Sequence, residues 1–251
     1  MKLISFCLWG DNPKYTEGAI KNAELAAEVY PDWRCRFYVG QSVSSIVTMR
    51  LEMHENTEVV RMPEWGNWKS MYWRFYPAAE EDVEAVISRD TDCRLSHREK
   101  AAVDEWMSSD KGFHIMRDHP YHAFPVLGGM WGAKRGCLPN MRQLIDNWSQ
   151  RDAYGTDYEF FAHAVMPLIQ GDVLVHDEFF GRRNESPHPL IELQGCAPDA
   201  FPTPREDLEF VGEVYDQSEQ RVPEHTTVLK NYLKDHYNEI ISNRRSRIYR
   251  K

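Results

Sequence analysis

Strand and helix patterns alternate along the first 107 residues, and no other feature of the sequence constrains the fold as strongly. Four short apolar runs predict strands, at 2–9, 33–39, 57–62 and 83–88. Three helical patterns accompany them, at 15–30, 68–76 and 96–107, and the last begins with the capping-box sequence Ser96-His97-Arg98-Glu99. This alternation predicts the α/β class, with a mainly parallel central sheet flanked by helices on both faces.

Polar residues follow two of these strands at the point where each strand ends. Trp9 and Gly10 follow the first strand, and Asp90-Thr91-Asp92 follows the fourth. Because ligands of parallel sheets bind at the carboxyl ends of the strands, we expect both segments to lie on the same edge. Two carboxylates one residue apart suit a hard divalent cation such as Mn²⁺ or Mg²⁺, which prefers oxygen ligands. A D-x-D sequence is also common in surface loops, so its position after a buried strand carries the prediction.

The second part of the chain has a less regular pattern, in which prolines and glycines interrupt 119–136. Two helices and a brief strand are predicted after it, at 140–150, 157–169 and 173–176. The proline-rich, polar segment 184–209 is predicted to be a surface loop that acts as a lid, and a final helix at 226–248 carries a basic tail. We predict one domain over 1–251, divided at 1–118, 119–210 and 211–251, with a strand and the basic helix in the last part.

Composition excludes several classes of protein. The chain has 251 residues, with 30 Lys and Arg against 39 Asp and Glu, so its net charge of −9 argues against nucleic acid as a partner. No stretch approaches the roughly 18–20 apolar residues that cross a membrane. The five cysteines are scattered and include no C-x-x-C pair, which argues against a zinc site or a disulfide framework. Reduced thiols favour a cytoplasmic location.

Several segments together resemble a known family. They are Trp68-Lys69-Ser70-Met71-Tyr72-Trp73-Arg74-Phe75, Ser88-Arg89-Asp90-Thr91-Asp92-Cys93-Arg94, Met116-Arg117-Asp118-His119-Pro120, Gly128-Gly129-Met130-Trp131-Gly132, and His176-Asp177 with Phe179-Phe180. The ordered set resembles the GT-A class of nucleotide-sugar glycosyltransferases, and more nearly the small glycosyltransferases of bacterial surface-polysaccharide clusters and large algal viruses. The resemblance spans most of the first 185 residues. It implies a single Rossmann-like domain, with the donor in 1–118, the acceptor in 119–210 and, for a viral chain, a location in the host cytoplasm.

The resemblance implies a metal site that holds Mn²⁺ or Mg²⁺. Asp92 would bind the ion directly, and Asp90 would bind it through water or bind the ribose instead. His176 would be the third metal ligand, although Asp177 competes for that role and a hydrogen-bonded structural histidine is an equal alternative. A metal held there would neutralise the charge that develops on the nucleoside diphosphate as it leaves.

The resemblance also implies a donor site and an acceptor site. Trp9 and Gly10 would border the base and ribose, and Arg74 and Arg89 would approach the ribose or diphosphate, where a planar guanidinium suits phosphate oxygens. The acceptor would lie against three residues, Gly128, Gly129 and Trp131. The two glycines equally suit a tight turn of the backbone.

A transferase that inverts the anomeric centre needs a general base, usually a carboxylate, whereas a retaining enzyme does not. Asp157 and Asp177 are the catalytic candidates for this base, with Asp118 and Glu178 as further possibilities. Asp157 also suits the N-cap of the helix that it begins. The sequence leaves inversion and retention open.

These inferences predict a metal-dependent glycosyltransferase that moves a hexosyl or pentosyl group from a nucleoside-diphosphate donor, in preference a UDP-sugar, to a hydroxyl of a glycan acceptor. A phosphatase of the haloacid dehalogenase type is one alternative, because it is also built around D-x-D after a strand, but Arg94 stands where such enzymes carry Thr or Val. A non-catalytic module that binds a nucleotide or a carbohydrate is the other.

Overall fold

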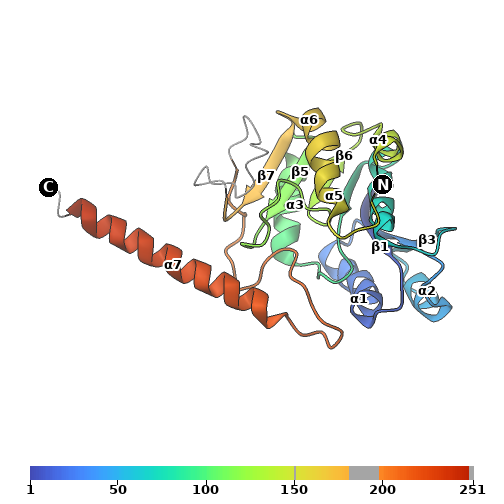
Figure 1. The fold of residues 1–251 in the computed structure, drawn as a ribbon, viewed down its shortest axis with the longest axis horizontal. Helices are drawn as coiled ribbons and strands as arrows, with labels where there is room; N and C mark the ends of the chain where they lie inside the picture. Colours follow the sequence, from blue (N-terminus) through green and yellow to red (C-terminus); the bar gives the residue numbers. More distant parts are fainter. Residues whose placement is uncertain (150, 181–197, 249–251) are drawn as a thin grey trace.

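The computed structural model describes residues 1–149, 151–180 and 198–248, with side chains of the last helix described as far as residue 235. Its centre is a seven-stranded sheet with the order β3-β2-β1-β4-β6-β5-β7 (Figure 1). The strands are β1 (Lys2–Leu8), β2 (Arg34–Val39), β3 (Thr57–Arg61), β4 (Ala85–Ser88), β5 (Phe113–Arg117), β6 (Trp131–Lys134) and β7 (Val173–Asp177). All neighbouring pairs are parallel except those of β6, which is antiparallel to β4 and to β5. The predicted α/β class and mainly parallel sheet are confirmed.

Helices cover both faces of this sheet. They are α1 (Pro13–Val29), α2 (Ser45–Glu52), the 3₁₀ helix η1 (Trp68–Ala79), α3 (His97–Ser108), α4 (Met141–Asn147), α5 (Thr156–Phe160), the π-helical turn η2 (Phe161–Val165), α6 (Met166–Ile169) and α7 (Pro223–Ile248). Side-chain caps fix where two of them begin: Asn12 accepts from the Lys14 N–H, and Ser96 accepts from the Glu99 N–H. In Figure 1, α7 runs outward from the body of the molecule. Among the residues that the structure describes, no helix is long and apolar enough to cross a membrane.

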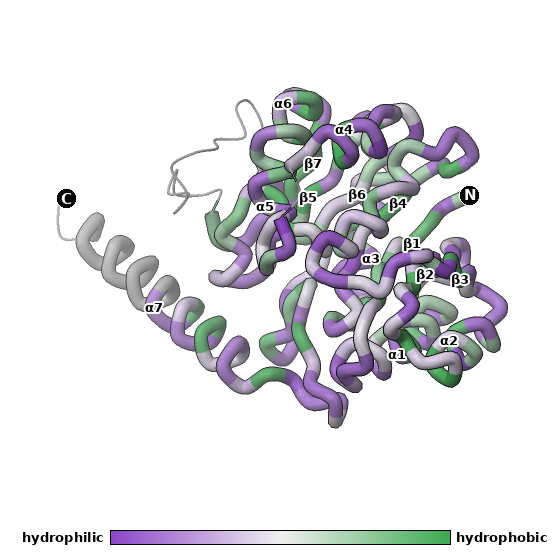
Figure 2. Tube along the Cα trace, turned by 45° about the vertical axis from the view of Figure 1, so that its right-hand side comes forward, coloured by the Kyte–Doolittle hydropathy of each residue, from purple (hydrophilic) through white to green (hydrophobic). Residues whose placement is uncertain are grey.

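The core consists of two apolar layers, one on each face of the sheet. Leu3 pairs with Val86, and both pack into the layer that η1, α4 and α5 cover. The next pair, Ile4 and Ile87, packs into the opposite layer, beneath α1, α2 and α3. Successive strand residues point to opposite faces, so a strand buried on both sides needs a continuous apolar run. Figure 2 shows hydrophobic segments in the interior and many hydrophilic segments at the periphery.

The structure differs from the sequence predictions in several elements. It adds α2, β5 and β6, which are short, and β6 lies in a glycine-rich segment without a strand pattern. The helix predicted at 157–169 is divided into α5, η2 and α6. The strand predicted at the start of 211–251 is absent from the described residues, where 211–222 is a loop with the isolated bridges Cys93↔Val214 and Tyr215↔Arg221. The predicted lid at 184–209 lies outside the described residues as far as 197.

Candidate functional site

A cavity of about 560 Å³ opens at the carboxyl ends of β1 and β4. Trp9 and Gly10, which follow β1, line it together with Asp90 and Asp92, which follow β4. The two segments that the sequence predicts on one edge of the sheet therefore meet. Gly10 adopts φ +75°, a left-handed conformation that suits glycine, and its N–H donates to Ser42 Oγ at 2.7 Å.

The floor of the cavity holds two carboxylates around one guanidinium. Arg74 of η1 is 3% exposed; its Nη1 donates to Asp90 Oδ1, and its Nη2 lies 3.7 Å from Asp157 Oδ2. Burial raises the pKa of Asp157 to about 6, and the charge of Arg74 opposes this rise. The N-cap of α5 is Gly155 rather than Asp157, so the carboxylate of Asp157 lines the cavity instead of capping the helix.

Two carboxylates pack directly against Gly128 and Gly129 and leave no room for a side chain at either position. A Cβ at Gly128 would lie 2.0 Å from Asp157 Oδ2, and a Cβ at Gly129 would lie 2.0 Å from Asp90 Oδ2. Gly128 lines the cavity, and its carbonyl accepts from Ser88 Oγ at 2.7 Å. Because these two positions carry no side chain, Asp90 and Asp157 can lie at the floor of the cavity.

Asp92 lies at the side of the cavity and forms an ion pair with Lys14, with 2.7 Å between Nζ and Oδ2. Burial raises the pKa of Asp92, the charge of Asp90 adds to the rise, and Lys14 opposes it. Asp11, Asp90, Asp92 and Asp157 are the carboxylates among the described lining residues, and Arg74 is the single Lys or Arg. The cavity therefore carries an excess of negative charge.

This donor set fits a hard divalent cation, since it offers carboxylate oxygens that the single guanidinium does not neutralise. Within the described part of the chain, no three His, Cys, Asp or Glu residues are grouped so that they could hold an ion by themselves. An ion bound between Asp90 and Asp92 would therefore complete its shell with water and with oxygens of a ligand, which is the usual arrangement for Mg²⁺ beside phosphates.

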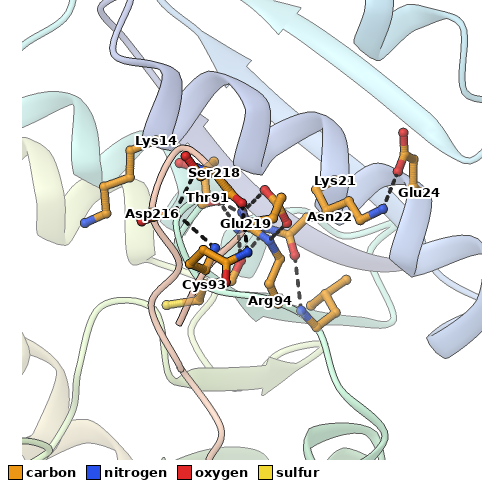
Figure 3. A network of polar contacts seen from close by, with 12 residues as sticks. Lys14, Lys21, Asn22, Glu24, Thr91, Cys93, Arg94, Asp216, Ser218 and Glu219 are labelled. Carbon is orange, nitrogen blue, oxygen red and sulfur yellow. Dashed lines mark hydrogen bonds and ion pairs between the residues drawn. The ribbon is translucent and has the colours of Figure 1, made fainter. Parts of the chain in front are cut away.

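The segment before α7 closes one side of the cavity. Its backbone joins the Asp92 loop, because the Tyr215 N–H donates to the Asp92 carbonyl at 2.9 Å and Cys93 Sγ lies 3.2 Å from the Gly212 carbonyl. Arg94 adds a forked ion pair with Glu219, at 2.6 and 3.1 Å (Figure 3). The sequence interpretation placed no site residue in this segment.

Aromatic and imidazole rings make up much of the remaining lining, and the sequence analysis did not predict most of them as site residues. Trp9, Trp68 and Tyr154 form a chain of edge-to-face contacts, with centroids 6.0 and 5.4 Å apart. Five further rings come from the loop after β5 and from the start of α7 with the segment before it: His119, Tyr121, His122, Phe210 and His225. The motif Arg117-Asp118-His119 was the one available signal for this group; Tyr121 and His122 follow it directly, whereas Phe210 and His225 meet it only in space.

Two predicted residues on β7 lie away from the cavity. His176 is fully buried; its Nδ1 is 2.8 Å from His114 Nε2, and its Nε2 is 3.4 Å from Glu105 Oε2. Asp177 is 2% exposed and pairs with Arg117 at 2.8 Å. Because β5 and β6 separate β7 from β4 in the sheet, the structure does not bring His176 to Asp90 and Asp92 or Asp177 to an acceptor. The roles predicted for these two residues do not fit this placement.

Arg89 and Trp131 are also interior residues. Arg89 is 2% exposed, and its Nε donates to the buried carboxylate of Glu99 at 2.7 Å. Glu99 also accepts from Tyr30, so its side chain serves this pair rather than the predicted capping box. Trp131 is fully buried and stacks on Phe113 with centroids 5.4 Å apart. Neither residue is among the described residues that line the cavity, so the predicted contacts of Arg89 with the donor and of Trp131 with the acceptor do not fit the structure.

No protein-family model and no curated protein matches the sequence. Solved structures that are similar include a glycosyltransferase involved in the glycosylation of the major capsid of PBCV-1 (14% identity, TM-score 0.49, 70% of this chain and 81% of that chain). A mannosyltransferase from Pyrobaculum calidifontis, in complex with GDP-Man and Mn²⁺, is also similar (14% identity, TM-score 0.49, 70% of this chain and 54% of that chain). The 4-diphosphocytidyl-2C-methyl-D-erythritol synthase of Anaerococcus prevotii is also similar (12% identity, TM-score 0.47, 71% and 87%). Glycosyltransferases are thus among the structures that the chain is similar to.

Proposed function

We propose that this protein is a metal-dependent glycosyltransferase that moves a sugar from a nucleoside-diphosphate donor, in preference a UDP-sugar, to a hydroxyl of a glycan acceptor. One observation carries the proposal: among the described residues, four carboxylates and a single guanidinium line the cavity at the carboxyl ends of β1 and β4. A diphosphate would add negative charge to a site that is already negative, so its binding requires a divalent cation. The preference for UDP comes from the sequence resemblance.

The residues of the cavity suit distinct parts of the donor. Trp9 and Gly10 border the base and ribose, and Arg74 holds Asp90 in place by a direct hydrogen bond. Asp92, with Asp90, would hold Mn²⁺ or Mg²⁺, which when bound neutralises charge on the leaving diphosphate. Lys14 pairs with Asp92 at 2.7 Å, and an ion bound by Asp92 would free Lys14 to interact with the diphosphate.

Asp157 is the group that suits proton transfer. Its carboxylate lines the cavity, and burial raises its pKa to about 6. A base whose pKa lies near the working pH is mostly ionised, yet accepts a proton more readily than an ordinary carboxylate. In an inverting reaction Asp157 would take the proton of the acceptor hydroxyl as that oxygen attacks the anomeric carbon.

Thermal unfolding with UDP, GDP and CMP, each with and without Mn²⁺, tests the proposal. A nucleotide at 100 times its dissociation constant stabilises the folded state by about 2.7 kcal/mol, which raises Tm by roughly 5–10 °C for a chain of this size. We expect this rise with one nucleotide and only in the presence of Mn²⁺. The Asp92→Asn variant should lose the rise, and the control Asp110→Asn, whose side chain is 89% exposed, should keep it.

The outcomes separate the candidate functions. No rise with any nucleotide, or a rise that is equal without Mn²⁺, would contradict a metal-dependent donor site. A nucleotide that stabilises the protein, with neither hydrolysis nor transfer of any sugar offered on that nucleotide, would instead identify a binding module. Release of phosphate from simple phosphate esters, lost in Asp90→Asn, would favour the phosphatase alternative.

A further inference from the structure

One wall of the cavity is built from uncharged rings. We call it the imidazole wall, and its members are His119, Tyr121, His122, Phe210 and His225. The charged residues that line the cavity within the described chain all lie outside this wall, at the floor and beside the β1 and β4 loops. The wall is therefore chemically unlike the part of the site that suits a diphosphate.

Internal hydrogen bonds hold the wall in place. His119 Nδ1 accepts from the Tyr121 N–H at 3.0 Å, and its Nε2 donates to the His225 carbonyl at 3.0 Å. The ring of His119 also lies against Phe210, with centroids 4.4 Å apart. The hydroxyl of Tyr121 donates to Glu224 at 3.0 Å. These contacts join the loop after β5 to the first turn of α7, so both nitrogens of His119 serve the structure.

His122 differs from His119, because only one of its nitrogens is engaged. Its Nδ1 accepts from the Asp118 N–H at 3.0 Å, which places the proton of the neutral ring on Nε2. No described residue accepts from this Nε2–H. Burial lowers the pKa of His122 to about 3 and that of His119 to about 4, so both rings are neutral at pH 7.

We propose that the imidazole wall is the acceptor subsite and that it selects an uncharged saccharide, one hydroxyl of which accepts from the Nε2–H of His122. This inference rests on the proposed glycosyl transfer and names its acceptor class. The sugar ring would lie against Tyr121, which is 49% exposed, since aromatic side chains combine an apolar face with a polar tip. Of the three residues predicted from the sequence to bind the acceptor, Gly128, Gly129 and Trp131, the buried Trp131 thus has no place in this subsite, whereas Gly128 lines the same cavity.

An anionic acceptor is disfavoured at this wall for two reasons. A carboxylate or phosphate that leaves water for neutral rings loses hydration, and the two arginines that act on these rings, Arg117 and Arg205, are already paired with Asp177 and Asp118. The one guanidinium of the described lining, Arg74, is already engaged by Asp90 and Asp157, and these same carboxylates repel an anion. A neutral sugar meets neither penalty, and its hydroxyls match a single N–H donor among apolar neighbours.

Direct binding to the full chain tests the inference independently of catalysis. Saturation-transfer NMR is recorded with the methyl glycosides of glucose, galactose and mannose, and with glucuronic acid and glucose 6-phosphate as charged probes. His122→Asn keeps an acceptor for the Asp118 N–H but cannot reach the position of Nε2, whereas His122→Gln places an amide N–H near that position. The control is His97→Ala, whose side chain is 75% exposed on the surface.

We expect one or more methyl glycosides to bind, neither charged probe to bind, and affinity to fall about tenfold in His122→Asn, which corresponds to about 1.4 kcal/mol. His122→Gln should recover part of this loss, and His97→Ala should leave the affinity unchanged. Equal binding of glucuronic acid or glucose 6-phosphate, no binding of any methyl glycoside, or equal affinity in His122→Asn would overturn the inference. Transfer from nucleotide sugars to the methyl glycosides that bind is measured separately. Its absence together with saccharide binding would count against the proposed transfer and not against the subsite.

Discussion

Replacing Asp157 by Asn should stabilise the protein at neutral pH while it removes glycosyl transfer. The carboxyl is 3% exposed, and its pKa is about 6 in the folded state against an ordinary value of 3.8. Each unit of difference corresponds to about 1.4 kcal/mol, so keeping Asp157 ionised costs the folded state about 3 kcal/mol. Asn has nearly the same shape, and its amide oxygen accepts the same hydrogen bonds without carrying a charge.

The pH dependence gives this prediction its sign. Between pH 4 and pH 6 the folded state binds more protons at Asp157 than the unfolded state does, so the contribution of this group to stability falls as pH rises through that window. The full penalty is present above pH 6. Asp157→Asn should therefore exceed the wild type in Tm by up to roughly 6–12 °C at pH 7.5, and the difference should nearly vanish at pH 4.

The assay is thermal unfolding of the wild type and Asp157→Asn from pH 4 to pH 8, in EDTA so that no divalent ion lowers the pKa of the carboxyl. Asp110→Asn serves as the control, because its exposed carboxyl should give a difference that is small at every pH. A Tm difference that does not change with pH, or a wild type that is the more stable protein at pH 7.5, would refute the reasoning. Transfer by Asp157→Asn should fall by about 10²–10⁴-fold if Asp157 is the general base.

Three further substitutions test separate parts of the site. Gly129→Ala brings a Cβ to 2.0 Å from Asp90 Oδ2 and 3.1 Å from Asp90 N, so the Mn²⁺-dependent rise in Tm with nucleotide should be lost, and a normal rise would contradict the close approach. Glu99→Gln leaves the buried guanidinium of Arg89 without its counter-charge, so it should lower the free energy of unfolding by about 3–5 kcal/mol, measured with denaturant. The rise in Tm with nucleotide should persist. Loss of that rise without loss of stability would show that Arg89 contacts the donor. His122 is neutral in the folded state, so protonation favours the unfolded state as pH falls below about 6.5. Between pH 6.5 and pH 4, the Tm of His122→Asn should therefore fall less than that of the wild type. An equal fall in Tm would contradict the lowered pKa.

The sequence predicts the structure of residues 1–118 well, because the signals in this part of the chain are local. The apolar runs that become β1 and β4 are continuous and end in turn residues, so their carboxyl ends can be located from composition alone. In a mainly parallel sheet Trp9 and Asp90 are expected at the same edge. They meet there because β1 and β4 are neighbours in the sheet.

The surroundings of β7 and the grouping of the imidazole wall could not be predicted in this way. His176 follows an apolar run, as Asp90 does, but two strands stand between β7 and β4, and strand order is not written in the local pattern. A histidine at the end of a strand then finds partners inside the core, here His114 and Glu105. His225 had no signal at all, because it reaches the cavity through the loop that pairs with Cys93.

The floor of the cavity is best understood as a conflict between stability and function. Burial that raises the pKa of Asp157 to about 6 destabilises the fold at neutral pH. The carboxylate of Asp157 fits only because residue 128 is glycine, which loses more conformational entropy on folding than any other residue. Two unfavourable choices that meet at one point, beside a buried arginine, are typical of a site where chemistry has prevailed over stability. The Asp157→Asn comparison measures this conflict directly, since one substitution should raise Tm and remove transfer together.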